Sequence, residues 1–109
     1  MAAYVIADTE IVDAALGARY RDLAQKSIAQ YGGRYIVRGG TVEPVEGGWE
    51  PKLFVIVEFP NMSRAHEWYN SPEYAEALKL RQTALRRRLI FVEGFTTENR
   101  TGSWPEDCS

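Results

Sequence analysis

Short apolar runs recur along the chain, and four of them predict β-strands. They cover residues 4–7, 34–38, 53–59 and 89–95, and turn-forming or charged residues bound each of them. Between the second and third runs, residues 41–51 are rich in proline and glycine, which is typical of a link between antiparallel neighbours. The pattern therefore predicts four strands, with a long connection between the middle two.

Helical periodicity fills the segment after the first strand. Asp13 is a candidate N-cap, and apolar residues then recur at spacings of three to five as far as Tyr31. Gly32-Gly33 ends this segment, because glycine adopts the left-handed conformation that closes many helices. We expect one helix with a single buried face, weakened in its first turns by Gly17.

Two successive helix starts precede the fourth strand. Ser63 is one candidate cap, and Ser71 followed by Pro72 is the other, with proline at its favoured first helical position. We expect a short helix near residues 64–70 and a longer one over residues 72–87, with a break between them.

The resulting order, β-α-β-β-α-β, predicts an α+β protein of the ferredoxin-like type. Its two β-α-β halves would share one four-stranded antiparallel sheet, with the helices on a single face. A chain of 109 residues is long enough for one such core and too short for two. We expect a single domain over residues 1–96 and a polar tail over residues 97–109.

Two of the predicted strands are apolar without interruption, over residues 53–57 and 89–92. Because side chains alternate between the two faces of a sheet, both faces of these strands are apolar. Helices on one side leave the other face exposed, which is costly and prone to aggregation. We expect a second copy of the chain to pack sheet against sheet as a homodimer. In the alternative, the tail with Trp104 folds back over the open face.

The charge balance narrows the class of partner. With 13 basic and 15 acidic residues the net charge is −2, which argues against a nucleic acid or an anionic membrane as partner. No apolar run approaches the roughly 20 residues of a membrane-spanning helix, and the first residues lack the pattern of a signal peptide. The single cysteine, Cys108, excludes an intramolecular disulfide. We expect a cytoplasmic protein.

An ordered set of short motifs resembles a known bacterial family. The motifs are Tyr31-Gly32-Gly33-Arg34-Tyr35, Arg38-Gly39-Gly40, Glu46-Gly47, Glu58-Phe59-Pro60, Ala65 with Trp68-Tyr69, Ser71-Pro72-Glu73-Tyr74, Leu80-Arg81 and Val92-Glu93-Gly94. Together, over about residues 4–95, they resemble the domain-of-unknown-function family 1330 of the dimeric α+β barrel superfamily.

The resemblance implies a ferredoxin-like protomer whose sheets pair in a homodimer, in agreement with the strand pattern. It implies no particular reaction, because the superfamily includes cofactor-independent monooxygenases, haem-processing enzymes and small-molecule lyases or isomerases. One departure concerns Gly17, where the family tends to carry an aromatic residue. Any pocket wall built from that side chain would be missing here.

Among the candidate site residues, Arg81 is the most informative about the kind of ligand or partner. On the longer helix it falls between Leu78 and Leu85 on the apolar stripe that begins at Tyr74. A guanidinium keeps its proton and is expensive to bury without a partner. Either Arg81 forms a buried ion pair, or it anchors an anionic ligand in a cavity.

Glu58 and Glu93 are candidate partners for that arginine, since each follows an apolar strand. A half-buried glutamate with a raised pKa would also suit general acid or base catalysis. In the simpler interpretation the two glutamates pair with Arg34, Arg38 or Arg81. Arg34 is in addition a candidate ligand-binding cation.

Trp68, Tyr69 and Tyr74 cluster around the predicted helix break. Aromatic residues with polar tips could form the mouth of an apolar pocket, or they could simply pack in the core. His66, the only histidine, fits a solvated surface position and has no metal-ligand spacing around it. The arginines at 86–88 fit a solvated end of the longer helix.

From these observations we expect a homodimer that binds a small anionic organic molecule between helices and sheet. Arg81 would anchor the ligand, with Tyr69 and Tyr74 in contact with it. We expect no metal and no cofactor, so an enzyme of this kind would rely on acid/base residues for isomerisation, lyase chemistry or oxygenation. The alternative is a non-catalytic binding or interaction module with a packed core and a structural Arg81 ion pair.

Overall fold

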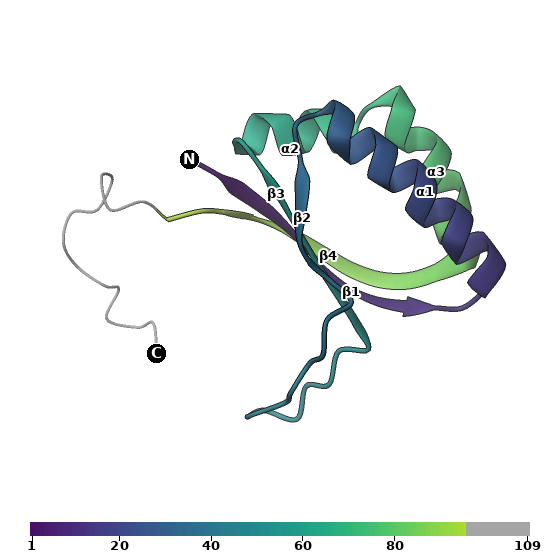
Figure 1. Cartoon of the computed structure of the whole chain (residues 1–109), viewed down its shortest axis with the longest axis vertical. Helices are drawn as coiled ribbons and strands as arrows, with labels where there is room; N and C mark the ends of the chain where they lie inside the picture. The colour runs from purple at the N-terminus through teal and green to yellow at the C-terminus, as the bar shows by residue number, and fades with distance from the viewer. Residues whose placement is uncertain (96–109) are drawn as a thin grey trace.

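The computed structural model describes residues 1–95 and contains one four-stranded sheet. Its strands, each antiparallel to its neighbours, are β1 (Ala3–Ile11), β2 (Arg34–Arg38), β3 (Leu53–Phe59) and β4 (Leu85–Glu93). The order across the sheet is β2-β3-β1-β4 (Figure 1). The ferredoxin-like fold predicted from the sequence is confirmed. The predicted tail, with Trp104, lies outside the described residues.

The helices all lie on one face of this sheet (Figure 1). They are α1 (Ala14–Gln30), α2 (Met62–Tyr69) and α3 (Pro72–Ala84). The longer two, α1 and α3, pack side by side. One layer of helices therefore covers one face of the sheet, as the sequence pattern predicts.

Polar side chains fix the start of each helix. Asp13 accepts a hydrogen bond from the Leu16 amide at 3.0 Å, and Ser71 accepts one from the Tyr74 amide at 3.0 Å. The cap of α2 is Asn61, whose side chain accepts from the Arg64 backbone amide at 2.9 Å. The expected cap at Ser63 is therefore wrong by two positions.

The boundary between α3 and β4 differs from the prediction. The helix ends at Ala84, and β4 begins at Leu85, so residues 86–88 form strand and not the last helical turn. The Ala84 carbonyl accepts from the amides of both Val12 and Asp13, at 2.8 and 3.2 Å, which ties the end of α3 to the end of β1. The strand then pairs along the whole of β1, which places Arg88 opposite Asp8. Pairing of opposite charges across neighbouring strands stabilises this longer strand.

The core lies between the helices and the sheet. Phe59, Trp68 and Tyr74 are its largest fully buried side chains. The indole of Trp68 donates to the Ser27 hydroxyl at 3.0 Å, so its polar tip is satisfied inside the core. Gly33 leaves room for these rings, because a Cβ there would lie 2.7 Å from the Phe59 ring.

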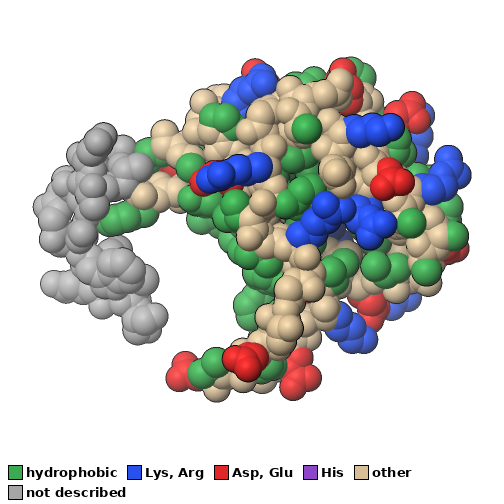
Figure 2. Space-filling model, viewed as in Figure 1, with side chains coloured by type: hydrophobic (Ala, Val, Ile, Leu, Met, Phe, Trp, Pro, Cys, Tyr) green, Lys and Arg blue, Asp and Glu red, His purple; other side chains and the backbone are tan. Residues whose placement is uncertain are grey.

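The other face of the sheet carries an apolar surface that no helix covers. Its residues, here called the open face, are Tyr4, Ile6, Phe54, Ile56, Ile90 and Val92. At its centre Ile6 lies between Ile56 and Ile90 in the strand register. In the chain described, Ile90 is 57% and Val92 39% exposed. Hydrophobic side chains follow the strands on this side in Figure 2. The strands are thus apolar on both faces, as the sequence predicts.

Candidate functional site

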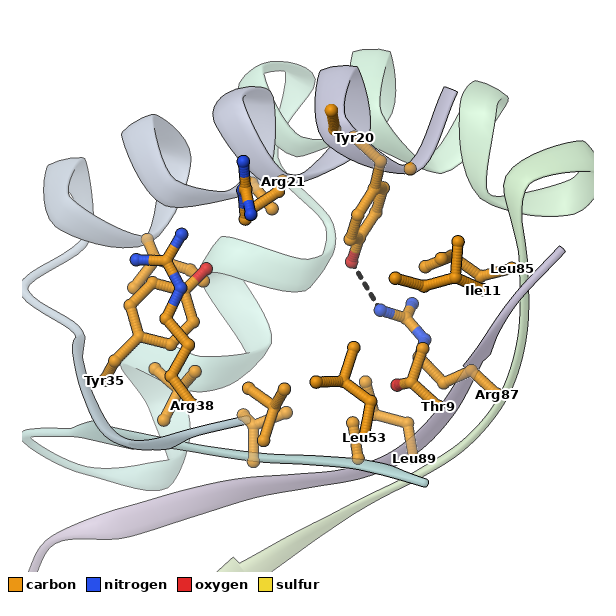
Figure 3. A pocket seen from close by; sticks show the side chains of 18 of the residues that line it. Thr9, Ile11, Tyr20, Arg21, Tyr35, Arg38, Leu53, Leu85, Arg87 and Leu89 are labelled. Atoms are coloured by element: carbon orange, nitrogen blue, oxygen red, sulfur yellow. Dashed lines mark hydrogen bonds between the residues drawn. The ribbon is translucent and has the colours of Figure 1, made fainter. Parts of the chain in front are cut away.

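A cavity of about 400 Å³ lies between α1 and the helix-covered face of the sheet (Figure 3). Its apolar walls include Val5, Ala7, Ile28, Val55, Val57 and Leu89. This volume is within the range of sites that hold small organic molecules. The space between helices and sheet is therefore a candidate binding site.

Small residues on α1 account for the empty space. The helix presents Ala14, Gly17, Ala18 and Ala24 to the cavity. Side chains of this size cannot span the distance between a helix and a sheet. The sequence therefore builds a regular helix whose inner surface leaves the core incompletely filled at this point.

Arg87 enters this cavity from β4. It donates through Nη1 to the hydroxyl of Tyr20 on α1, and through Nη2 to the hydroxyl of Tyr74 on α3 at 2.9 Å. The two hydroxyl oxygens are 2.6 Å apart, so the three groups form one network. Figure 3 shows the hydrogen bond between Arg87 and Tyr20 across the cavity. Thr9, the strand neighbour of Arg87, lies at the same end.

This network contains a cation but no carboxylate. Burial of Tyr74 raises the pKa of its phenol far above the usual range, so the hydroxyl stays neutral. Burial tends to lower the pKa of Arg87, but its contacts with Tyr20 and Tyr74 outweigh burial and leave that pKa raised. Among residues 1–95, Arg87 has no ion pair, and no aspartate or glutamate lines the cavity. The site thus presents a partly buried positive charge with neutral partners.

Two further arginines lie at the far end of the cavity. Arg21 reaches down from α1, and Arg38 rises from the end of β2 beside Tyr35 (Figure 3). The Arg38 guanidinium lies 4.6 Å from the centre of the Tyr35 ring. Burial raises the pKa of Tyr35, and the positive charges of Arg38 and Arg21 oppose that rise. Both arginines are exposed, so they form the rim of the site.

Trp68, Tyr69 and Tyr74, the aromatic residues expected at a pocket mouth, lie in different surroundings. Trp68 is buried and lines the cavity, and Tyr74 contributes its hydroxyl to Arg87. Tyr69 is not among the cavity-lining residues, and its ring packs against Trp68 and Phe91 with centroids 5.9 Å away in each case. His66 is exposed, with its ring against Phe91.

Arg81, the anchor expected from the sequence, is not among the cavity-lining residues. It is half-buried on α3, and its Nε atom is buried without a hydrogen-bond partner in the described chain. Within those same residues it also has no ion pair. The structure therefore brings Arg81 together with neither Glu58 nor Glu93.

The two glutamates and Arg34 also lie away from the cavity. Glu58 points to the uncovered side of the sheet, where Arg34 binds it at 2.7 Å and the Tyr4 hydroxyl donates to it at 3.2 Å. Glu58 is thus in an ion pair with Arg34, the simpler of the two interpretations that the sequence allows. Glu93 is exposed at the end of β4.

Arg87 and Tyr20 are not among the site residues predicted from the sequence. Extension of α3 to residue 87 placed the arginine on a solvated helix end, whereas β4 turns it inward. A signal was present, since Arg87 lies two residues from Leu85 and two from Leu89, the spacing at which side chains share one face of a strand. Tyr20 gave no signal beyond its place on the apolar stripe of α1.

Fold and cavity together define a ferredoxin-like α+β protein with an arginine-containing cavity between helices and sheet. The chain belongs to the family described as "Domain of unknown function (DUF1330)", which it matches over residues 2–95. Among curated proteins, no sequence matches this chain significantly.

Several solved structures share the fold. A protein of unknown function from Rhodopseudomonas palustris is 20% identical, with a TM-score of 0.72 over 87% of this chain and 83% of its own. A dimeric protein of unknown function with a ferredoxin-like fold, from Bacteroides fragilis, is 17% identical, with a TM-score of 0.55 over 85% of this chain and 96% of its own. SnoaB, a cofactor-independent oxygenase from Streptomyces nogalater, is 7% identical, with a TM-score of 0.58 over 91% and 97%. At these identities the likeness concerns the fold alone.

Residues 1–95 contain no group of three or more histidine, cysteine, aspartate or glutamate side chains placed to hold a metal ion. None of the helices within that range has the length and hydropathy to cross a membrane.

Proposed function

We propose that this protein binds a small organic anion in the cavity between α1 and the sheet, with Arg87 as the anchor. The observation that carries the proposal is the partly buried guanidinium, whose only hydrogen-bond partners in the described chain are two neutral phenols. A buried charge without a counterion is unfavourable. An anionic ligand would supply the missing charge, and its apolar body would occupy the apolar remainder of the cavity.

The geometry suits a carboxylate or a similar oxyanion. A guanidinium has five N–H donors in a planar fork, of which two are occupied by Tyr20 and Tyr74. The remaining donors favour acceptors with paired oxygens. A ligand with an apolar body would displace water from the apolar walls, which strengthens such charge-assisted hydrogen bonds.

The test compares Arg87→Met with Arg86→Met. Both positions lie on β4, but residue 86 faces the other side of the sheet and does not line the cavity. Octanoate serves as the probe, and calorimetry and amide chemical shifts report binding. We expect Arg87→Met to weaken binding by roughly tenfold to a hundredfold, and Arg86→Met to leave it unchanged. Methionine keeps most of the packing, so thermal unfolding should show a folded protein.

Two results would contradict this proposal. One is octanoate binding of equal strength in the Arg87→Met variant, and the other is no binding of octanoate by the unmodified protein. In the first case the arginine is a structural cation, and in the second the cavity belongs to an imperfectly packed core.

In an enzyme, the network of Arg87, Tyr20 and Tyr74 would have a second role. The N–H groups of Arg87 that Tyr20 and Tyr74 leave free would stabilise negative charge as it develops on a bound substrate. SnoaB, which has the same fold, is a cofactor-independent oxygenase, and this supports a reaction without a cofactor. Since Glu58 and Glu93 lie away from the cavity, this second role assigns proton transfer to Tyr20 and not to the carboxylates predicted from the sequence.

We also propose that the chain forms a homodimer through its open face. The exposed apolar side chains at the centre of that face, Ile90 above all, support this assembly. The charged pairs Arg34–Glu58 and Arg88–Asp8 lie on the same side of the sheet and would form a polar rim. The dimeric Bacteroides fragilis protein of the same fold gives further support.

A further inference from the structure

The positive charges of the cavity are divided between its two ends. Arg87 lies at one end with Tyr20 and Thr9, and Arg21 and Arg38 lie at the other (Figure 3). In the space-filling view, positively charged side chains gather at the front of the gap between helices and sheet (Figure 2). In the described chain none of the three arginines has an ion pair.

The distance between the two ends follows from the sheet. Arg87 is on β4 and Arg38 on β2, the two outermost of the four strands. Three strand spacings of about 4.8 Å separate their backbones by roughly 14 Å. The register adds an offset along the strands, because Arg87 pairs with Thr9 whereas Arg38 is aligned through Val55 with Ala7. Tyr20 and Tyr74 hold the Arg87 guanidinium at its end, and the Arg38 guanidinium lies against the Tyr35 ring at the other, so one anionic group for each end fits this arrangement.

The surface between the ends is apolar. Ala7 and Val55 lie on the direct line across the sheet, with Leu53 and Leu89 beside them. Among the described residues that line the cavity there is no carboxylate to neutralise either end. The cavity is therefore apolar in its middle, with a partly buried cation at one end and two exposed cations at the other.

From this arrangement we infer that the ligand has two anionic groups joined by an apolar segment, as in a medium-chain dicarboxylate. The inference rests on the proposed function, because it assigns the first anionic group to Arg87. It adds that Arg21 and Arg38 recognise the second group. They therefore determine specificity for two charges over one.

The experiment measures affinity for two matched pairs of acids, octanoate with octanedioate and decanoate with decanedioate, at constant ionic strength. In the unmodified protein we expect the diacid of at least one pair to bind roughly threefold to tenfold more tightly, the size expected for contacts at an exposed rim. The Arg21→Gln, Arg38→Gln double variant should lose this preference and keep its affinity for the monoacid. Arg19→Gln is the matched control, because Arg19 is exposed on α1 and does not line the cavity.

Salt provides an independent readout. The preference for the diacid should shrink as ionic strength rises, since exposed charges are screened more than buried ones. The Arg87→Met variant should bind all four acids weakly.

The outcomes separate this inference from the proposed function. Equal affinity for monoacid and diacid in the unmodified protein, with binding still dependent on Arg87, would overturn the inference alone. A diacid preference that survives the double variant would also overturn it. Failure of all four acids to bind would overturn both proposals.

Discussion

Arg87 differs from an ordinary surface arginine in what surrounds it. Its neighbours along β4, Arg86 and Arg88, point to the opposite side of the sheet, and Arg88 binds Asp8 at 2.9 Å. Within the described chain, Arg87 instead donates hydrogen bonds only to hydroxyl groups, and its guanidinium lies 5.5 Å from the centre of the Tyr20 ring. The same residue type therefore has two different environments along one strand, because the pleat directs alternate side chains to the uncovered side of the sheet and into the cavity.

The partly buried arginine of the cavity is not the one that the sequence singled out. An arginine on an apolar surface was expected, and one is present, but at residue 87 on β4 and not at residue 81 on α3. Tyr74 was identified because it lies on a strongly periodic helix. Tyr20 and Arg87 were not, since only the tertiary structure brings these residues together across 67 positions of the chain.

Asp8 offers a pH-dependent test at the level of one residue. The indole of Trp49 donates to its carboxylate at 3.0 Å, and Arg88 donates to the same oxygen. These two contacts lower the pKa of Asp8 below its ordinary value of 3.8. Because the pKa is lowered in the folded state, the stabilisation is complete above 3.8 and is lost as the pH falls through the lower folded value.

We expect the indole N–H resonance of Trp49 to be constant at neutral pH and to shift at acidic pH with a midpoint below 3.8. Proton–nitrogen correlation spectra across this range measure the change, with Trp49→Phe to assign the signal. Asp8→Asn is the control and should abolish the titration. A midpoint above 3.8 would contradict the contact, since it would mean that the folded state favours the protonated acid.

At the scale of elements, the sequence predicted most of the architecture. Strands and helices with clear periodicity and capping residues, such as α1 after Asp13, agree with the structure. The predicted boundary between α3 and β4 was wrong, because three consecutive arginines suit a helix end as well as a strand. Pairing with β1, a contact between distant parts of the chain, decides in favour of the strand.

The inner surface of α1 gives the second prediction. Gly17 faces the cavity within the helix, and a Cβ there would lie 3.2 Å from Cγ2 of Ile11, an exposed and adaptable side chain. We expect Gly17→Ala to stabilise the protein by about 0.5 kcal/mol, because alanine favours the helix and the contact needs only a small shift. Urea denaturation measures this change.

A larger side chain at the same position should close the cavity. We expect Gly17→Leu to remain folded and to reduce octanoate binding at least as much as Arg87→Met does. Ala15→Leu is the matched control, since Ala15 is exposed on the same helix and is not a cavity-lining residue. Undiminished octanoate binding by Gly17→Leu would place the ligand somewhere other than this cavity.

At the scale of the whole molecule, the two faces of the sheet differ in what they pack against. One face forms the wall of the cavity under the helices (Figure 1), and the other carries the open face, through which we propose that two copies pair. The apolar runs on β3 and β4 are explained by this division, because alternate residues of the same strand serve the core and the proposed interface. A strand with one wet face would instead alternate apolar and polar residues.

Ile90→Glu tests the assembly. Ile90 is 57% exposed in the single chain, so a charge there costs the protomer little, but in a sheet-to-sheet dimer it would be buried without a partner. We expect light scattering at micromolar concentration to give the mass of two chains for the unmodified protein and of one for this variant. Val45→Glu, at a position that is 88% exposed and away from the strands, should stay dimeric.

Because no residue of the open face lines the cavity, the monomeric Ile90→Glu variant should still bind octanoate. A single-chain mass for the unmodified protein would leave the open face without its proposed cover, whereas loss of both dimer and ligand in Ile90→Glu would show that the partner completes the site.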